Sequence, residues 1–190
     1  MQIFDTLRNK KTELEFSDKV RIYLCGVTVY DDAHIGHART IIVFDVLRRF
    51  LESQNIPVEF IQNFTDVDDK IIDRARQEKI SPLELAAKYT KNYFDDFDRL
   101  NIKRATIYPK ATEHIEDMQN LISNLVDKKY AYVTKNGVYF SVSKFTEYGK
   151  LSKKKTDDLI SGARVAVDEE KSNPIDFAYL QYAQSPLGIW

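Results

Sequence analysis

One stretch, residues 23–50, limits the possible folds more than any other part of the chain, because three patterns follow one another in it. An apolar, β-branched and aromatic run predicts a short strand over 21–24, and Cys25 and Gly26 mark its expected end. A polar loop follows. From Gly36 onward, apolar residues recur at helical spacing on more than one face, which predicts a helix packed between a sheet and a second layer.

This strand–loop–helix order also predicts where a ligand binds. In an open α/β sheet, ligands lie beyond the carboxyl ends of the strands, and a helix start offers free N–H groups to a phosphate. His34 and His37 share one face of the first turn, and Gly36 between them has no side chain to keep a flat ring away. Such imidazoles can stabilise charge that develops at phosphorus. They can equally be a polar cap, and the residue types alone leave both interpretations open.

A second strand is expected over 58–63, and the polar residues that follow it point to the same crevice. Thr65, with Asp68 three positions later, resembles a capping box for the next helix. That helix start would face Cys25 across the crevice. A lone cysteine is more often a small buried hydrophobe, so a buried free thiol is the alternative interpretation of Cys25.

The later chain predicts further helices and a hairpin. Ser81 and Pro82 are a typical cap and first helical residue, and the aromatic stripe that follows is typical of a core face. Thr112 can cap a further helix. Asn136 and Gly137 indicate a β-hairpin. The helix after Thr112 is expected to bury Ile115, Met118, Leu121, Ile122 and Leu125.

Composition excludes several classes of protein. The chain has 190 residues, 43% of them hydrophobic, enough for one core or a core with an appendage. It has no apolar run long enough to span a membrane and no apolar signal-peptide centre near Met1. A single cysteine excludes an internal disulfide framework and favours a cytoplasmic location. A formal net charge of -1 gives no argument for nucleic-acid binding.

A family resemblance sharpens this interpretation. The tetrapeptide HIGH, between a strand and an apolar helix, resembles the first signature of class I aminoacyl-tRNA synthetases. Three longer segments, CGVTVYDDAHIGHAR, FIQNFTDVDDKII and GARVAVDEEKSNPIDFA, resemble the cysteinyl-tRNA synthetases. The resemblance implies an α/β fold. Residues 1–105 would form the first half of a Rossmann-like nucleotide-binding fold with a parallel sheet. Residues 106–190 would be an α+β connective-peptide insertion that turns back toward the catalytic domain, with a further strand within 161–178.

The same resemblance implies an activity: ATP, with Mg²⁺, activates L-cysteine to cysteinyl-adenylate, which is then transferred to tRNA(Cys). It implies catalytic roles for His34 and His37 at the triphosphate. The remaining implied contacts are Thr28, Tyr30 and Gly36 for ATP, and Cys25, Gly26 and Thr65 for cysteine.

The resemblance also implies that Cys25 is one ligand of a zinc ion that binds the substrate thiolate. The family takes its other ligands, a cysteine, a histidine and a glutamate, from later in its chain. None has a counterpart here, since His114 is expected to be a surface residue, so tight zinc binding is not expected.

The family's second catalytic half, its lysine-containing KMSKS loop, its helical domain and its anticodon-reading region also have no counterpart in these 190 residues. We therefore expect a monomeric fragment with little or no ligase activity. Three alternatives stay open: a truncated, non-catalytic binding module, the related cysteine ligase of mycothiol biosynthesis, and a small nucleotidyltransferase.

Overall fold

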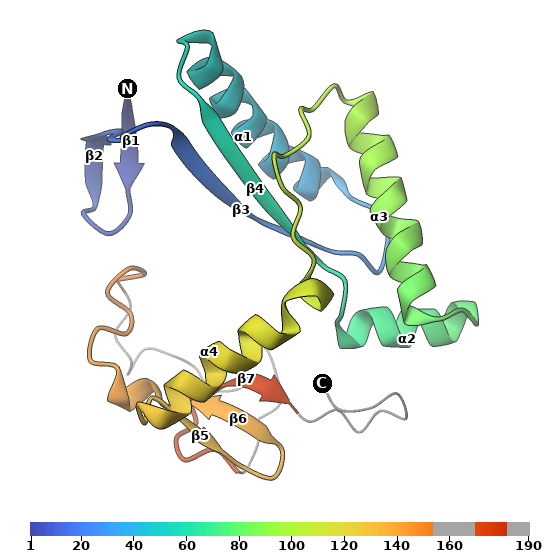
Figure 1. Cartoon of the computed structure of the whole chain (residues 1–190), viewed down its shortest axis with the longest axis vertical. Coiled ribbons are helices and arrows are strands. Elements are labelled where there is room, and N and C mark those ends of the chain that lie inside the picture. Colours follow the sequence, from blue (N-terminus) through green and yellow to red (C-terminus); the bar gives the residue numbers. More distant parts are fainter. Residues whose placement is uncertain (154–169, 182–190) are drawn as a thin grey trace. The chain divides into compact units, whose positions relative to one another are not determined.

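The computed structural model describes residues 1–153 and 170–181, which form two compact units. One unit is Glu15–Ile115, and the other joins residues 1–14 to the described residues from Glu116 onward. Figure 1 labels the elements of both. The part of the expected strand that falls on 161–169 lies outside the described residues. The division at residue 105 into two functional domains stays a prediction.

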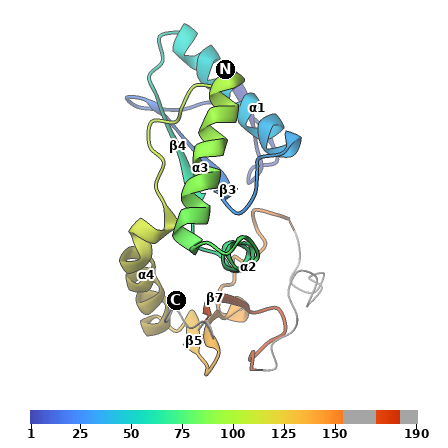
Figure 2. The same ribbon diagram turned by 90° about the vertical axis from the view of Figure 1, so that its right-hand side faces the viewer.

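The unit Glu15–Ile115 is built on a parallel β–α–β motif. Strands β3 and β4 pair in parallel with α1 between them in sequence, which confirms the expected α/β architecture with a parallel sheet. Helices α2 and α3 follow β4, and in Figure 2 α2 is seen nearly along its axis near the start of α3. The elements are β3 (Val20–Thr28), α1 (Ile35–Ser53), β4 (Val58–Thr65), α2 (Asp69–Glu78), α3 (Pro82–Arg99) and the 3-10 helix η1 (Ala111–His114).

An extended segment from Thr106 to Lys110 runs along the free edge of β4. Its carbonyls at Ile107 and Pro109 accept hydrogen bonds from the N–H groups of Gln62 and Phe64, at 3.1 and 2.9 Å. Isolated parallel bridges mark the same pairing. This segment therefore satisfies backbone groups of β4 that would otherwise be exposed at a sheet edge.

The helices cover one face of the β3–β4 pair. Along β4, Phe60, Gln62 and Phe64 are buried in alternation, as expected for a strand with one covered face. α3 turns the predicted aromatic stripe inward and so confirms it as core. The core cluster is Leu24, Val29, Ala38, Ile41, Phe60, Phe64, Ile71, Ala75, Leu85, Ala86, Tyr89, Tyr93 and Phe97.

The prediction that α1 is covered on more than one face is wrong for the described residues. α1 buries Ala38, Ile41 and Leu51, whereas Val43 and Val46 are each 60% exposed. Among the described elements, α1 packs with one side only, and its opposite side is not covered by a second layer.

Two helix starts test the capping predictions. α3 begins as expected: Ser81 and Glu84 form a capping box, and Pro82 is the first helical residue. α2 does not, because its cap is Asp68, which accepts a hydrogen bond from Lys70 N at 2.9 Å. Thr65 is instead the last residue of β4, where pairing with β3 holds it in extended conformation.

A polar network joins α2 to α3 around Glu78. The Glu78 carboxylate accepts hydrogen bonds from Lys88 Nζ at 2.7 Å, from Tyr89 Oη at 2.9 Å and from Arg74 Nε at 2.9 Å. The bond from Lys88, followed by that from Tyr89, lowers the pKa of Glu78 from 4.5 to about 2.

This depressed pKa predicts acid sensitivity. A carboxyl group with a lowered folded-state pKa contributes stability above its unfolded pKa of 4.5, and that contribution is lost as the pH falls toward 2. We expect the difference in unfolding free energy between the wild-type chain and Glu78→Gln to be full at neutral pH and to shrink below pH 4.5. Urea denaturation at several pH values measures it. A difference that stays constant through this range would contradict the assignment.

The described residues of the second unit form two small antiparallel sheets. One pairs β1 (Gln2–Asp5) with β2 (Lys10–Glu13), and the other has the order β5–β6–β7. β5 and β6 confirm the predicted hairpin, and Gly137 has a φ of 153°, a conformation that favours glycine. The other elements are α4 (Ile115–Asp127), β5 (Ala131–Val133), β6 (Gly137–Phe140), the 3-10 helix η2 (Val142–Lys144) and β7 (Phe177–Gln181).

Helix α4 corrects two predictions. None of its residues is buried, and Met118 and Leu121 are 43% and 60% exposed. Thr112 does not cap it either, because its N–H and hydroxyl donate to the Asp66 carboxylate at 3.0 and 2.6 Å.

Within the described ranges, no helix combines the length and apolar character that crossing a membrane requires.

Candidate functional site

The first site feature is a bulge in β3. The strand runs on to Thr28, so the prediction that it ends at Cys25 and Gly26 is wrong. Its register with β4 shifts between Leu24 and Val27, which places Cys25 and Gly26 together opposite Asn63. A bulge of this kind redirects side chains without ending the strand.

Gly26 lets the two strands approach closely at this bulge. A Cβ atom added to Gly26 would lie 1.3 Å from the backbone oxygen of Asn63, so no other residue fits there without movement of the backbone. The Gly26 N–H donates to Asn63 Oδ1 at 2.8 Å, and the hydroxyl of Tyr23 donates to the same oxygen at 2.9 Å. The bulge is therefore tied to β4 by a side-chain amide.

The alternation of side chains places Cys25 on the face that the helices do not cover. Leu24 and Val27 pack with the core, whereas Tyr23 and Cys25 are exposed. The Cys25 thiol lies 3.8 Å from the Gly26 carbonyl oxygen. It is thus an exposed free thiol, and the alternative of a thiol buried as a small hydrophobe is wrong.

Two further predicted contacts lie at the carboxyl ends of the strands. Thr28 and Thr65 are register partners, and each is the last residue of its strand. The Val29 N–H donates to the Thr65 carbonyl at 3.2 Å. The residue predicted to contact ATP and the one predicted to contact cysteine are therefore neighbours across the strand pair.

The loop between β3 and α1 is anchored to α2 and α3. Val29 is 1% exposed, and Tyr30 packs against the core with Lys70 Nζ 5.3 Å from its ring centre. Asp32 accepts a hydrogen bond from Asn92 on α3 at 2.7 Å. This anchoring gives the chain a defined path from the strand ends into the helix.

The predicted histidine pair forms the start of α1. His34 is the cap: its Nδ1 accepts from the Gly36 N–H at 3.1 Å, and its own N–H donates to Nδ1 of His37 at 3.2 Å. The two rings stack, with centroids 3.8 Å apart and planes at 17°. The cap interpretation is confirmed, and it does not exclude a role at phosphate.

The cap determines which nitrogen carries the proton. A backbone N–H only donates, so Nδ1 of His34 and of His37 must be acceptors, and in the neutral rings Nε2 is the donor. Burial, and then the nearby His34, lower the pKa of His37, which keeps this ring neutral at pH 7. A Cβ on Gly36 would lie 2.9 Å from the His34 ring, so the absence of a side chain at Gly36 makes room for that ring. Contact between Gly36 and ATP stays a prediction.

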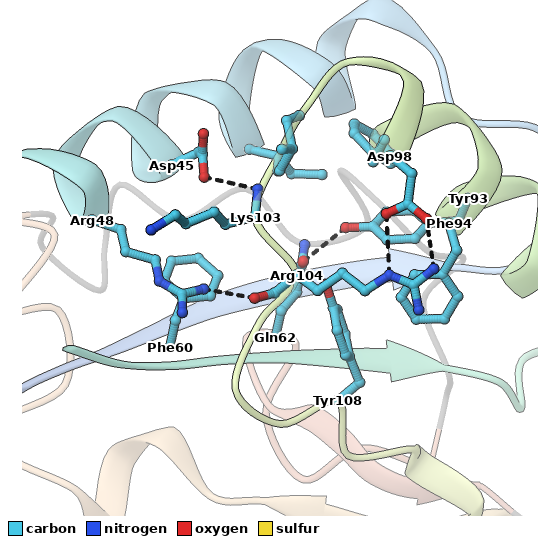
Figure 3. A pocket seen from close by; sticks show the side chains of 13 residues that line it. Asp45, Arg48, Phe60, Gln62, Tyr93, Phe94, Asp98, Lys103, Arg104 and Tyr108 are labelled. Atoms are coloured by element: carbon cyan, nitrogen blue, oxygen red, sulfur yellow. Dashed lines mark hydrogen bonds and ion pairs between the residues drawn. The ribbon is translucent and has the colours of Figure 1, made fainter. Parts of the chain in front are cut away.

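A small pocket lies apart from all these residues, on the helix-covered side. Figure 3 shows it between α1, β4, α3 and the segment after α3. Its volume is about 10 Å³, room for about one water molecule. The labelled lining residues are Asp45, Arg48, Phe60, Gln62, Tyr93, Phe94, Asp98, Lys103, Arg104 and Tyr108.

The polar groups of this pocket are engaged with one another. Arg48 Nη1 donates to the Arg104 carbonyl at 2.6 Å, and the Arg104 guanidinium pairs with Asp98 through two bonds of 3.1 and 2.6 Å. The Tyr93 hydroxyl donates to Gln62 Oε1 at 2.7 Å. These contacts therefore hold the segment after α3 in place. None of the predicted site residues lines the pocket.

The described residues do not fit a zinc ion. Among them, no group of three or more histidine, cysteine, aspartate or glutamate side chains is placed to hold a metal. Cys25 alone supplies one thiolate, and zinc requires three or four protein ligands.

Sequence reasoning missed Asn63 and Tyr23. Asn63 lies within a segment that carries the family resemblance, and Tyr23 lies two residues before another. Neither stands out in the sequence, because their role depends on the pairing of two strands. A glycine directly after the candidate thiol was the available signal, since glycine inside a strand often marks a bulge or a close backbone approach.

Comparisons with known proteins agree on one family. A family model described as the class I (C) tRNA synthetase catalytic domain matches residues 12–186. A curated cysteine–tRNA ligase of Thermodesulfovibrio yellowstonii is 55% identical over 100% of this chain, which covers 40% of that relative. The cysteine–tRNA ligase of Thermococcus kodakarensis is 50% identical with the same coverage of each. The chain thus spans about 40% of the length of these relatives.

A solved structure supports the fold. The methionyl-tRNA synthetase of Mycobacterium tuberculosis in complex with methionyl-adenylate superposes with a TM-score of 0.54 at 21% sequence identity. The match covers 65% of this chain and 25% of that protein. At this identity the likeness concerns the fold alone, and it agrees with the parallel β3–β4 pair and its helices.

Proposed function

The chain belongs to the class I (C) tRNA synthetase catalytic-domain family, and from this premise we propose that it carries part of a site for ATP-dependent activation of L-cysteine. One observation supports this most. Cys25, Thr28 and Thr65 lie on the β3–β4 pair, and the carboxyl end of β3 leads into α1, the helix that His34 and His37 cap. This is the position in which open α/β sheets bind their ligands.

The proposed reaction begins with the carboxylate of cysteine. Its oxygen attacks the α-phosphorus of ATP, which arrives with Mg²⁺, and the bond to the β-phosphate breaks and releases pyrophosphate. In the second half, a terminal ribose hydroxyl of tRNA(Cys) attacks the carbonyl carbon of the adenylate and releases AMP and a proton. No protein nucleophile is needed, so the protein contributes positioning and charge stabilisation.

In this proposal His34 and His37 donate hydrogen bonds from Nε2 to the triphosphate, with Thr28 and Tyr30 beside the nucleotide. Because both rings accept a backbone hydrogen bond at Nδ1, each presents its Nε2–H as the donor. Cys25, Gly26 and Thr65 face the amino acid. The exposure of the Cys25 thiol and the position of Thr65 at the strand end support this assignment.

The main test exchanges segments between relatives. This chain would replace the matching segment of the Thermodesulfovibrio yellowstonii ligase, and cysteine-dependent ATP–pyrophosphate exchange would be measured. We expect exchange to persist in the chimera and to fall about 100-fold or more in its His34→Ala/His37→Ala variant, since loss of one such donor costs 10²–10³-fold in comparable sites. Equal activity of the two chimeras would exclude the proposed role of the histidines.

Gly36→Ala should separate stability from function. Alanine stabilises a helix by about 1 kcal/mol relative to glycine. However, its Cβ would displace the His34 ring, and the loss of this helix cap would cost a similar free energy. We expect the midpoint of urea denaturation to change little while exchange by the chimera falls at least about tenfold. Thr40→Ala, one turn further along α1, is the control, and we expect it to leave exchange unchanged. A fully active Gly36→Ala chimera would contradict this account of Gly36.

Three finer assignments belong to the same proposal: tRNA(Cys) as acceptor, a monomeric state and a cytoplasmic location. An acceptor assay of the chimera with tRNA(Cys) against glucosaminyl-inositol separates this reaction from the mycothiol-type alternative, and sedimentation of the 190-residue chain tests the monomer. The identity to curated cysteine–tRNA ligases supports tRNA as acceptor.

A further inference from the structure

Two consecutive amides of β4 serve opposite faces of the sheet. Gln62 points into the helix-covered side, where it is 2% exposed and accepts from Tyr93. Asn63 points the other way, toward the bulge of β3. Its Oδ1 accepts two hydrogen bonds, from the Gly26 N–H at 2.8 Å and from the Tyr23 hydroxyl at 2.9 Å.

The bulge makes this acceptor necessary. Where two residues of one strand face one residue of its neighbour, the ladder cannot satisfy every backbone group. The Gly26 N–H lies in a partly buried position, and a donor left there without a partner costs free energy. The Asn63 side chain replaces the missing ladder bond. Tyr23, which lies two residues before Cys25, holds that side chain with a second hydrogen bond.

We propose that Asn63 is a positioning residue that holds the β3 bulge and thereby sets the direction of the Cys25 thiol. The inference rests on the proposed function in one respect, namely that Cys25 faces the amino acid substrate. Its structural part, the link from Asn63 to the bulge, is independent of any ligand and can be measured without one.

The chain offers a clean probe, because Cys25 is its only cysteine. A thiol reagent such as iodoacetamide therefore reports on Cys25 alone, at one fixed pH. Hydrogen exchange of the Gly26 amide, followed by NMR, reports on the bulge itself. Asn63→Leu removes the acceptor at similar volume, and Asn63→Asp retains an acceptor at the same position.

We expect exchange of the Gly26 amide to rise about fivefold to tenfold in Asn63→Leu, the equivalent of one lost neutral hydrogen bond, and to stay near wild type in Asn63→Asp. The alkylation rate of the exposed Cys25 thiol should change by about threefold in Asn63→Leu, because the released bulge no longer holds the thiol in one direction. Asn92→Ala is the matched control: it loses a side-chain amide bond in the same unit, to Asp32, without touching the bulge. Neither readout should change in it.

The outcomes separate the possible errors. Unchanged hydrogen exchange of the Gly26 amide in Asn63→Leu would overturn the proposal. Faster exchange of this amide with an unchanged alkylation rate of Cys25 would leave Asn63 a purely structural role, which would overturn the proposal as well. Exchange of the Gln62 amide, which donates to the Ile107 carbonyl at the other edge of β4, identifies global destabilisation. Calorimetry with a sulfamoyl analogue of cysteinyl-adenylate tests the link to function. Absence of binding by the chimera counts against the proposed function, while the exchange and alkylation results still decide the role of Asn63.

Discussion

Gly26→Ala is expected to abolish the native pairing of β3 with β4. The added Cβ would lie 1.3 Å from the Asn63 carbonyl oxygen, and that obstacle is backbone rather than a movable side chain. Relief requires one strand to move away from the other at the point where Asn63 also binds the Gly26 N–H. We expect a loss of more than about 3 kcal/mol in the free energy of unfolding, above the usual range for overpacking.

Urea denaturation followed by circular dichroism measures this loss. Cys25→Ala is the matched control, because it changes the neighbouring residue of the same bulge but only trims an exposed side chain. Its stability should stay within about 0.5 kcal/mol of wild type. A Gly26→Ala protein as stable as this control would show that the strands do not approach as closely as described.

Phe64→Ala is the second change with a large expected effect. Phe64 is 1% exposed, and the centre of its ring lies 5.0 Å from the ring centre of Tyr93 and 5.3 Å from that of Tyr108. Removal of a buried aromatic ring leaves a cavity and costs about 3–5 kcal/mol. Because Phe64 lies between Asn63 and Thr65, the loss should also loosen the end of β4 that carries the proposed site.

The same denaturation experiment applies, with Phe16→Ala as control. Phe16 belongs to the same compact unit but is 44% exposed, so its truncation should cost less than about 1 kcal/mol. Hydrogen exchange at Val29 N–H, which bonds the Thr65 carbonyl, would report the loosening at the strand end. Similar stabilities of the two variants would contradict the placement of Phe64 in the core.

Local patterns predicted the elements whose causes are local. Ser81, Pro82 and Glu84 specify the start of α3 through contacts within four residues, and the structure has that capping box. The hairpin around Gly137 follows from a backbone conformation that glycine favours. The His34–Gly36–His37 cap is likewise formed within one helical turn, so one of the two interpretations of the histidines was available from residue types and spacing.

Predictions failed where a distant residue decides the outcome. Thr65 has the spacing of a cap, but pairing with Thr28 keeps it in the strand and Asp68 takes the role. Thr112 can cap a helix, but its hydroxyl binds Asp66, which is 46 positions away. In both cases a tertiary contact competes with a local preference of similar size, and spacing alone does not reveal the competitor.

The sequence by itself determined the family, the order of strand, loop and helix, and the histidine cap, because each depends on residues close together in the chain. Only the tertiary structure decided that β3 continues through Gly26, that the helices leave the face with Cys25 uncovered, and that Asn63 secures the bulge. The physical reason is that a bulge is a property of two paired strands. Its register depends on how Leu24 and Val27 align with β4, and neither strand carries that information alone.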